Sequence, residues 1–262
     1  MFARFIVGAV IALGIVILAR RAGTLASSGA VAAFVVGTVA IGAGWSWGAL
    51  VVTYFLTSSA LSRYGAAVKE TRTGGMVEKG GERDAVQVLA NGALFTVAAA
   101  LSVAGLLAPV DAAALGAGTL AASASDTWAT EVGTLSASPP RSIVSGRAVA
   151  PGTSGGVTFV GTLAAIAGAA FVALTAATLR WPASVALGAF VGGCVGSTLD
   201  SLLGATVQAR RWCERCGRGT ERMVHDCGAL SRPSGGVSWL GNDAVNLISS
   251  AVGGLLAMLL AR

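Results

Sequence analysis

The sequence predicts an all-α integral membrane protein, a single helical bundle with about eight transmembrane helices, between seven and nine. Of its 262 residues, 54% are hydrophobic and only 11% are charged. The mean hydropathy is +0.75, which is typical of a polytopic membrane protein. The 37 glycines agree with this class, because small residues let transmembrane helices approach one another closely.

Eight apolar runs are each close to the length that a bilayer core requires. They span about 3–19, 24–43, 45–63, 86–107, 111–135, 154–179, 183–207 and 239–260. The first run resembles a signal-peptide core, but Arg20 and Arg21 follow it directly, so we keep it as a membrane span. The runs predict one transmembrane domain over residues 1–262, with a polar loop at 208–238.

The basic residues predict how this bundle is oriented. With eight spans the loops alternate between two faces, and one face receives 15 of the 18 Lys and Arg residues. The other face receives only Arg4, Arg180 and Arg262. Positively charged loops stay inside, so we expect a plasma-membrane protein with both termini outside. The same bias accounts for the net charge of +6 without nucleic-acid binding.

Four carboxylates, Asp126, Glu131, Asp200 and Asp243, lie in apolar stretches. A charged group at the centre of a membrane helix costs roughly 2.5–3.5 kcal/mol, so its retention needs a reason. Ser, Thr and Asn residues flank these acids, and such oxygen ligands suit a divalent cation and its phosphate. In the predicted topology the acids lie at the cytoplasmic side, around one cavity. They could instead be satisfied interhelical hydrogen-bonding groups, or line an ion or proton pathway.

A glycine-rich segment, Pro151–Gly156, is predicted to open the sixth helix. Pro, Thr, Ser and Gly are common at helix starts for capping reasons alone. Arg141 and Arg147 precede the segment, however, so it could cradle phosphate with free N–H groups and cationic side chains.

Six motifs occur in order along the chain. They are Lys79–Gly92, Ala124–Gly133, Pro139–Arg147, Pro151–Val157, Gly196–Ala205 and Trp239–Asn246. Together they resemble the integral membrane family that contains plant phytyl-phosphate kinase and human transmembrane protein nineteen. More distantly, their order is similar to that of CTP-dependent dolichol and phytol kinases and CDP-diacylglycerol synthase, although Gly152–Gly156 lacks a glutamate found in those enzymes.

This resemblance implies a transferase of isoprenoid metabolism. It would move a phosphoryl group from a nucleoside triphosphate, with CTP favoured, to phytyl, geranylgeranyl or farnesyl phosphate. Asp126, Asp200 and Asp243 would hold Mg²⁺, and Glu131 would support catalysis. The nucleotide- and phosphate-binding residues would be Arg141, Arg147, Thr153, Ser154, Gly155, Gly156, Lys79, Arg83, Asp84, Asn91, Asn242 and Asn246. A cytidylyltransferase that forms a CDP-lipid and a non-enzymatic transporter are the alternatives, and the distant relatives suggest a homodimer.

The loop 208–238 carries a second motif, Cys213-x-x-Cys216 followed by His225-x-Cys227. Four such ligands within fifteen residues are typical of tetrahedral Zn²⁺, and four protein ligands would make the site structural. A disulfide is not expected on a cytoplasmic face. Reduced thiols without metal, or a loop that contacts anionic lipid through its arginines, are the alternatives.

Overall fold

The computed structural model describes residues 2–76 and 81–262, and this part of the chain is mostly helical. Its helices are α1 (Phe2–Arg21), α2 (Ser27–Ala43), α3 (Trp45–Arg63), α4 (Ala66–Thr73), α5 (Ala85–Val103), α6 (Pro109–Gly133), α7 (Phe159–Thr178), α8 (Ala183–Thr206) and α9 (Asn242–Leu260). Its strands are β1 (Arg141–Ser142), β2 (Gly156–Val157), β3 (Arg210–Cys213), β4 (Arg218–Thr220) and β5 (Arg232–Gly235). They form two small antiparallel sheets, β1–β2 and β4–β3–β5.

The predicted order of long helices is confirmed, because each apolar run contains one long helix and α3 has the predicted bounds. The all-α class holds for the bundle only, since the loop 208–238 contains a three-stranded sheet. The short polar helix α4 was not predicted. The prediction that a helix opens at residue 154 is wrong, because α7 begins at Phe159.

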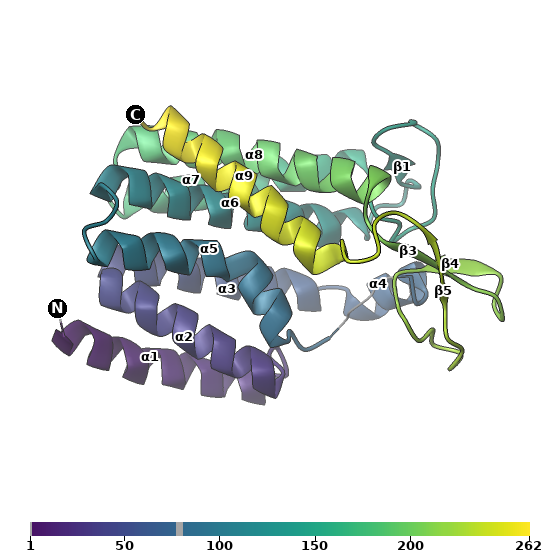
Figure 1. Cartoon of the computed structure of the whole chain (residues 1–262), viewed down its shortest axis with the longest axis horizontal. Helices are drawn as coiled ribbons and strands as arrows, with labels where there is room; N and C mark the ends of the chain where they lie inside the picture. Colours follow the sequence, from purple (N-terminus) through teal and green to yellow (C-terminus); the bar gives the residue numbers. More distant parts are fainter. Residues whose placement is uncertain (1, 77–80) are drawn as a thin grey trace.

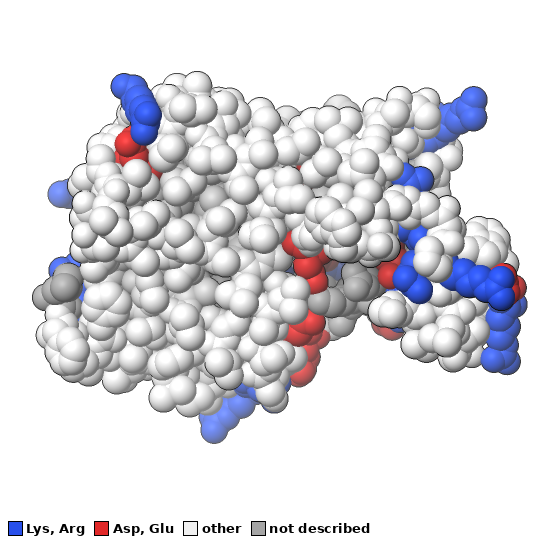
Figure 2. Space-filling view, in the orientation of Figure 1, with Lys and Arg blue, Asp and Glu red and all other residues white. Residues whose placement is uncertain are grey.

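Five helices in the described part are long and apolar enough to cross a membrane, namely α1, α5, α7, α8 and α9, while α2 is apolar but shorter. Figure 2 shows a broad uncharged surface over the bundle, with Lys and Arg side chains gathered toward its ends. Val10, Leu18 and Leu174 are at least 66% exposed, as expected for side chains that face lipid.

The core is centred on α6, which packs against α5, α7, α8 and α9. The α6 residues between Ala112 and Ser125 are Ala, Gly, Leu, Ser and Thr, and almost all are buried. Small residues permit very close helix contacts. A Cβ added at Gly192 of α8 would lie 2.2 Å from the Gly253 carbonyl oxygen of α9. There is no room for a methyl group, so this contact requires glycine.

The two ends of the bundle differ (Figure 1). Both termini lie at one end, where an Arg262–Asp111 ion pair at 3.1 Å joins α9's C-terminus to the first turn of α6. The strands and α4 lie at the opposite end. We call the end that carries the strands and α4 the loop end.

Candidate functional site

Two of the predicted acids meet inside the bundle. The side chains of Asp126 of α6 and Asp200 of α8 lie within hydrogen-bonding reach of each other. Ser249 of α9 donates its hydroxyl to Asp200 Oδ2 at 2.8 Å. Three helices that are far apart in the sequence thus each contribute one polar side chain to this group, which we call the acid pair site.

The close contact between α6, α8 and α9, called the helix seam below, explains why these side chains meet. On α8, the close-packed glycines Gly192 and Gly196 precede Asp200 at steps of four residues, so the three share one helix face. A Cβ added at Gly196 would lie 2.6 Å from Ala122 Cβ of α6. Ala122 lies four residues before Asp126. The tight packing of α6 against α8 therefore aims both carboxyl groups at one point.

Asp243 and Asn246 lie in the first turns of α9, nearer the loop end. The rise of an α-helix separates Asp243 from Ser249 by roughly 9 Å along the axis. Asn246 Oδ1 is buried without a hydrogen-bond partner among the described residues. Asn242 is the first residue of α9. In Figure 2, acidic side chains are visible near the starts of α5 and α9.

Glu131, which was predicted to support catalysis, forms an ion pair with a lysine of α4. Lys69 of α4 approaches Glu131 Oε2 at 2.5 Å, and Ser62 donates to Glu131 Oε1 at 2.6 Å. Lys69 is buried and also donates to the carbonyl oxygens of Leu61 and Ser62 at the end of α3. Lys69 was not among the predicted site residues. The signal was a single lysine at the end of an alanine-rich segment directly after an apolar helix.

Tyr54 and Arg83 connect the acid pair site with Ser62. Tyr54 is buried in α3, with its hydroxyl in hydrogen-bonding reach of the Thr127 side chain and with Arg83 and Asp126 as charged neighbours. Arg83 donates from Nη2 to Ser62 Oγ at 3.1 Å. The backbone of Arg83 is fixed as well, because it exchanges hydrogen bonds with Thr24 and Ala26.

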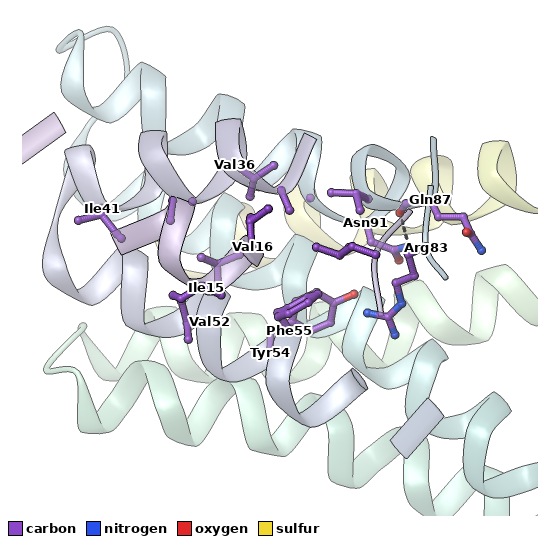
Figure 3. A pocket seen from close by; sticks show the side chains of 17 residues that line it. Ile15, Val16, Val36, Ile41, Val52, Tyr54, Phe55, Arg83, Gln87 and Asn91 are labelled. Atoms are coloured by element: carbon purple, nitrogen blue, oxygen red, sulfur yellow. Dashed lines mark hydrogen bonds between the residues drawn. The ribbon is translucent and has the colours of Figure 1, made fainter. Parts of the chain in front are cut away.

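An apolar pocket opens between α1, α2, α3 and α5 (Figure 3). Ile41 lies toward one end, and aliphatic side chains line most of its length. Arg83, Gln87 and Asn91 lie together at the other end, and Tyr54 forms part of the wall. The polar end of the pocket therefore shares Arg83 and Tyr54 with the surroundings of Asp126.

Asp84, which was predicted to bind phosphate, caps α5. Its Oδ1 accepts a 2.9 Å bond from the Gln87 backbone N–H, and the Gln87 side chain accepts from the Asp84 backbone. This reciprocal pair is a capping box. The adjacent Asn91 donates to the Gln87 carbonyl oxygen at 2.9 Å. The predicted Lys79 lies outside the described residues.

The glycine-rich segment does not present a helix N-terminus. Thr158 is the N-cap of α7, accepting from Gly161 N–H at 3.0 Å. Thr153 to Gly156 form a turn that leads into β2. Gly155 has a φ of +74°, and a Cβ there would lie 2.5 Å from Ala205 of α8. The glycine is explained by this close approach of the turn to α8, which sequence alone could not reveal.

Ser154 of this turn is part of a polar network with the loop 208–238. Its hydroxyl bonds to the Glu221 carboxylate, and Gln208 Nε2 donates to Ser154 Oγ at 2.9 Å. Arg141 and Arg147 lie on the same connection and are both exposed. Arg141 donates to the Gly146 carbonyl oxygen at 2.9 Å. Both arginines are therefore accessible to an anion that arrives from solution.

The predicted zinc ligands are brought together at the loop end. One ligand atom from each of Cys213, Cys216, His225 and Cys227 lies within 4.8 Å of the others. Hydrogen bonds from the Ala229 backbone N–H and the His225 ring lower the pKa of Cys227 to about 6. The hydrogen bond with Cys227 raises the pKa of Cys216 to about 11. Cys227 thus favours the thiolate, the form of cysteine that binds metals.

The bundle, its uncharged surface and the acid pair inside it define an integral membrane protein. The sequence matches the family described as Integral membrane protein DUF92 over residues 10–254, and the chain belongs to that family. It is 33% identical over 247 residues to Protein PGR of Arabidopsis thaliana, covering 85% of this chain and 84% of that protein. It is 30% identical over 218 residues to an uncharacterised membrane protein of Methanocaldococcus jannaschii, covering 83% of this chain and 77% of that protein. No solved structure matches this chain.

Proposed function

We propose that this protein is a kinase that transfers the terminal phosphoryl group of a nucleoside triphosphate, with CTP favoured, to a prenyl monophosphate. The observation that carries the proposal is the position of the acid pair site next to an apolar pocket with an arginine at its polar end. A lipid phosphate suits that combination, because its tail is apolar and its head is anionic. Arg83 would bind the head with charge-assisted hydrogen bonds.

The carboxyl groups of Asp126 and Asp200 support a role for Mg²⁺. Two carboxylates that share a poorly solvated site repel each other unless a proton or a cation intervenes. Their oxygens, with the unpartnered Asn246 Oδ1 on the neighbouring helix, are the donor types that Mg²⁺ selects. When bound, Mg²⁺ would neutralise charge on the transferring phosphates. Asp243 would extend this donor set toward the nucleotide.

The proposed reaction needs positioning more than covalent help from the protein. An oxygen of the prenyl phosphate forms a new bond to the terminal phosphorus of the triphosphate, and the bond from that phosphorus to the nucleoside diphosphate breaks. The acceptor is already ionised, so no side chain has to remove a proton. Arg141 and Arg147, exposed at the loop end, would hold the triphosphate. In this proposal the loop end faces the cytoplasm, eight helices span the membrane and both termini lie outside.

The test is an assay of purified protein with Mg²⁺, prenyl monophosphates and CTP labelled at either the α- or the γ-phosphorus. The expected products are CDP and a prenyl diphosphate that carries the γ label. Release of pyrophosphate with the α label in a CDP-lipid would replace the kinase by a cytidylyltransferase. Absence of either product with phytyl, geranylgeranyl and farnesyl phosphate and several nucleotides would refute enzymatic phosphotransfer and leave a transporter.

The acid pair has a matched control in the same chain. Asp126→Asn and Asp200→Asn should reduce transfer by more than the roughly 10- to 100-fold that loss of an outer-shell partner of a metal costs. Asp111→Asn removes an acid from α6 at the opposite end of the bundle, where it pairs with Arg262. Full activity of the first two variants, or equal loss in all three, would contradict the assignment.

A further inference from the structure

The Cys and His side chains of the loop 208–238 have the spacing of a tetrahedral metal site. Cys213 Sγ lies 3.6 Å from Cys227 Sγ, and His225 Nδ1 lies 3.4 Å from Cys227 Sγ. Around zinc, with Zn–S near 2.3 Å and Zn–N near 2.0–2.1 Å, two sulfurs are about 3.8 Å apart and a sulfur and a nitrogen about 3.6 Å. A disulfide would need sulfurs about 2.05 Å apart. The measured separations therefore fit a shared ion.

Two glycine turns hold the ligands in place. After Cys213 and Cys216, Gly217 has a φ of +61° and donates its N–H to the Cys213 carbonyl oxygen. After His225 and Cys227, Gly228 has a φ of +80° and donates to the His225 carbonyl oxygen. Each pair of ligands thus precedes a backbone turn that glycine adopts without strain. The two turns thus orient the four Cys and His side chains toward one point even without a bound ion.

The same loop lacks an apolar core that could hold it folded. Between residues 208 and 238 the buried residues are Gln208, Cys213, Thr220, His225 and Ser231. None is a large aliphatic residue or a Phe, Tyr or Trp, and all four residues of β5 are exposed. A segment of this size with so little buried apolar surface needs an additional constraint, such as a structural metal, to stay folded.

The loop also holds two neighbouring segments of the loop end. Thr220 donates its hydroxyl to the Gly75 carbonyl oxygen at 2.9 Å, and Glu221 N–H donates to the Met76 carbonyl oxygen at 2.8 Å. Through Gln208 and Glu221 the loop bonds to Ser154. The segment at 75–76 follows α4, and the turn that contains Ser154 packs on the end of α8.

We propose that Cys213, Cys216, His225 and Cys227 bind one structural Zn²⁺, and that this ion clasps the loop 208–238 onto the 75–76 and 151–157 segments. Four protein ligands close the coordination shell, so the ion has no place for substrate. The clasp is independent of the proposed phosphotransfer, since it follows from the ligand geometry and the loop contacts alone.

Metal analysis of the purified full-length protein tests the site. About one zinc per chain is expected in the wild type, and Cys213→Ser and His225→Ala should lose it. His225→Cys should keep zinc, because a four-cysteine shell also binds it. Cys194→Ser is the matched control, as Cys194 lies in α8 outside the cluster. A metal-free wild type, or a Cys213→Ser variant with full zinc, would overturn the site.

Hydrogen exchange tests the clasp on the wild-type protein, so that it does not depend on a variant that folds. Removal of zinc with a chelator should increase amide exchange in the loop 208–238 and also in 75–76 and 151–157. Re-addition of zinc should reverse the increase, and the buried part of α6 should not change. An increase confined to the loop itself would overturn the clasp while leaving the metal site in place.

Discussion

Glu131 shows how a neighbour decides the role of a buried acid. The carboxylate lies five residues from Asp126, yet its direct partners are the Lys69 ammonium group and the Ser62 hydroxyl. Lys69 also bonds to two carbonyl oxygens at the end of α3. The pair therefore joins α3, α4 and α6, so Glu131 helps to hold these three helices together.

We predict that Lys69→Met lowers the free energy of unfolding by about 3–5 kcal/mol, because it leaves a largely buried carboxylate without its cation. Thermal or denaturant unfolding in detergent measures this loss. The double variant Lys69→Met with Glu131→Gln removes both charges and should recover much of the stability. A double variant no more stable than Lys69→Met alone would contradict the ion-pair explanation.

The role of Arg83 can also be tested by changing a single residue. We predict that Arg83→Gln weakens binding of a prenyl monophosphate roughly 10- to 100-fold, the equivalent of one or more lost charge-assisted hydrogen bonds. Binding of the matching prenyl alcohol should change little, because the alcohol carries no anionic head. Titration of both lipids in the absence of nucleotide measures the difference. Equal weakening for the two lipids would show that Arg83 acts on the pocket's shape and not on the phosphate.

At the scale of the elements, glycine contacts set how closely the helices pack. A Cβ at Gly192 would meet the Gly253 carbonyl oxygen at 2.2 Å, and one at Gly188 would meet the Ala257 carbonyl oxygen at 2.6 Å. Backbone atoms cannot move aside as a flexible side chain can. Because Asp200 continues the same face of α8, the seam also positions the acid pair.

We predict that Gly192→Ala destabilises the bundle by about 1–3 kcal/mol, as expected for overpacking. Gly14→Ala in α1 is the matched control, since a Cβ there meets no atom within 4 Å. It should be neutral or stabilising by up to about 1 kcal/mol through helix propensity. Unfolding curves of the two variants test the seam, and similar stabilities would argue against it.

At the scale of the whole molecule, the two ends of the bundle carry different residues and structural elements. The strands, α4 and the cluster of Cys213, Cys216, His225 and Cys227 lie at the loop end, while the termini and the α7–α8 turn lie at the other end (Figure 1). The uncharged surface between the ends fits a bilayer. The distribution of basic residues predicts that the loop end is cytoplasmic.

Accessibility labelling tests this orientation. In a Cys194→Ser background, Thr71→Cys in α4 and Ala183→Cys at the start of α8 place exposed thiols at opposite ends. A membrane-impermeant maleimide applied to intact cells should label Ala183→Cys, and should label Thr71→Cys above the level of the Cys194→Ser background, which keeps the exposed Cys216, only after permeabilisation. Labelling of both from the outside would refute the eight-span topology with external termini.

Several site residues could be predicted from the sequence, and others could not. Asp126 and Asp200 are conspicuous because charged groups are rare in apolar helices, and the Cys and His ligands because they are close together in the chain. Lys69 and Tyr54 were less conspicuous, because a lysine in a short polar segment and an aromatic residue in an apolar run are ordinary. The residues Thr153 to Gly156 resembled the start of a helix, but their glycines allow this segment to pack closely against α8.

The sequence by itself determined the membrane class, the order of the long helices and which Cys and His residues come together in the loop 208–238, because hydropathy over some twenty residues and residue spacing within fifteen are local properties. Only the tertiary structure decided which acids meet and which are neutralised. Asp126 faces Asp200 across two helices, and Glu131 faces Lys69, 62 residues away. Such pairings depend on how each helix is rotated in the bundle, and that rotation is set by the close glycine contacts between helices distant in the chain.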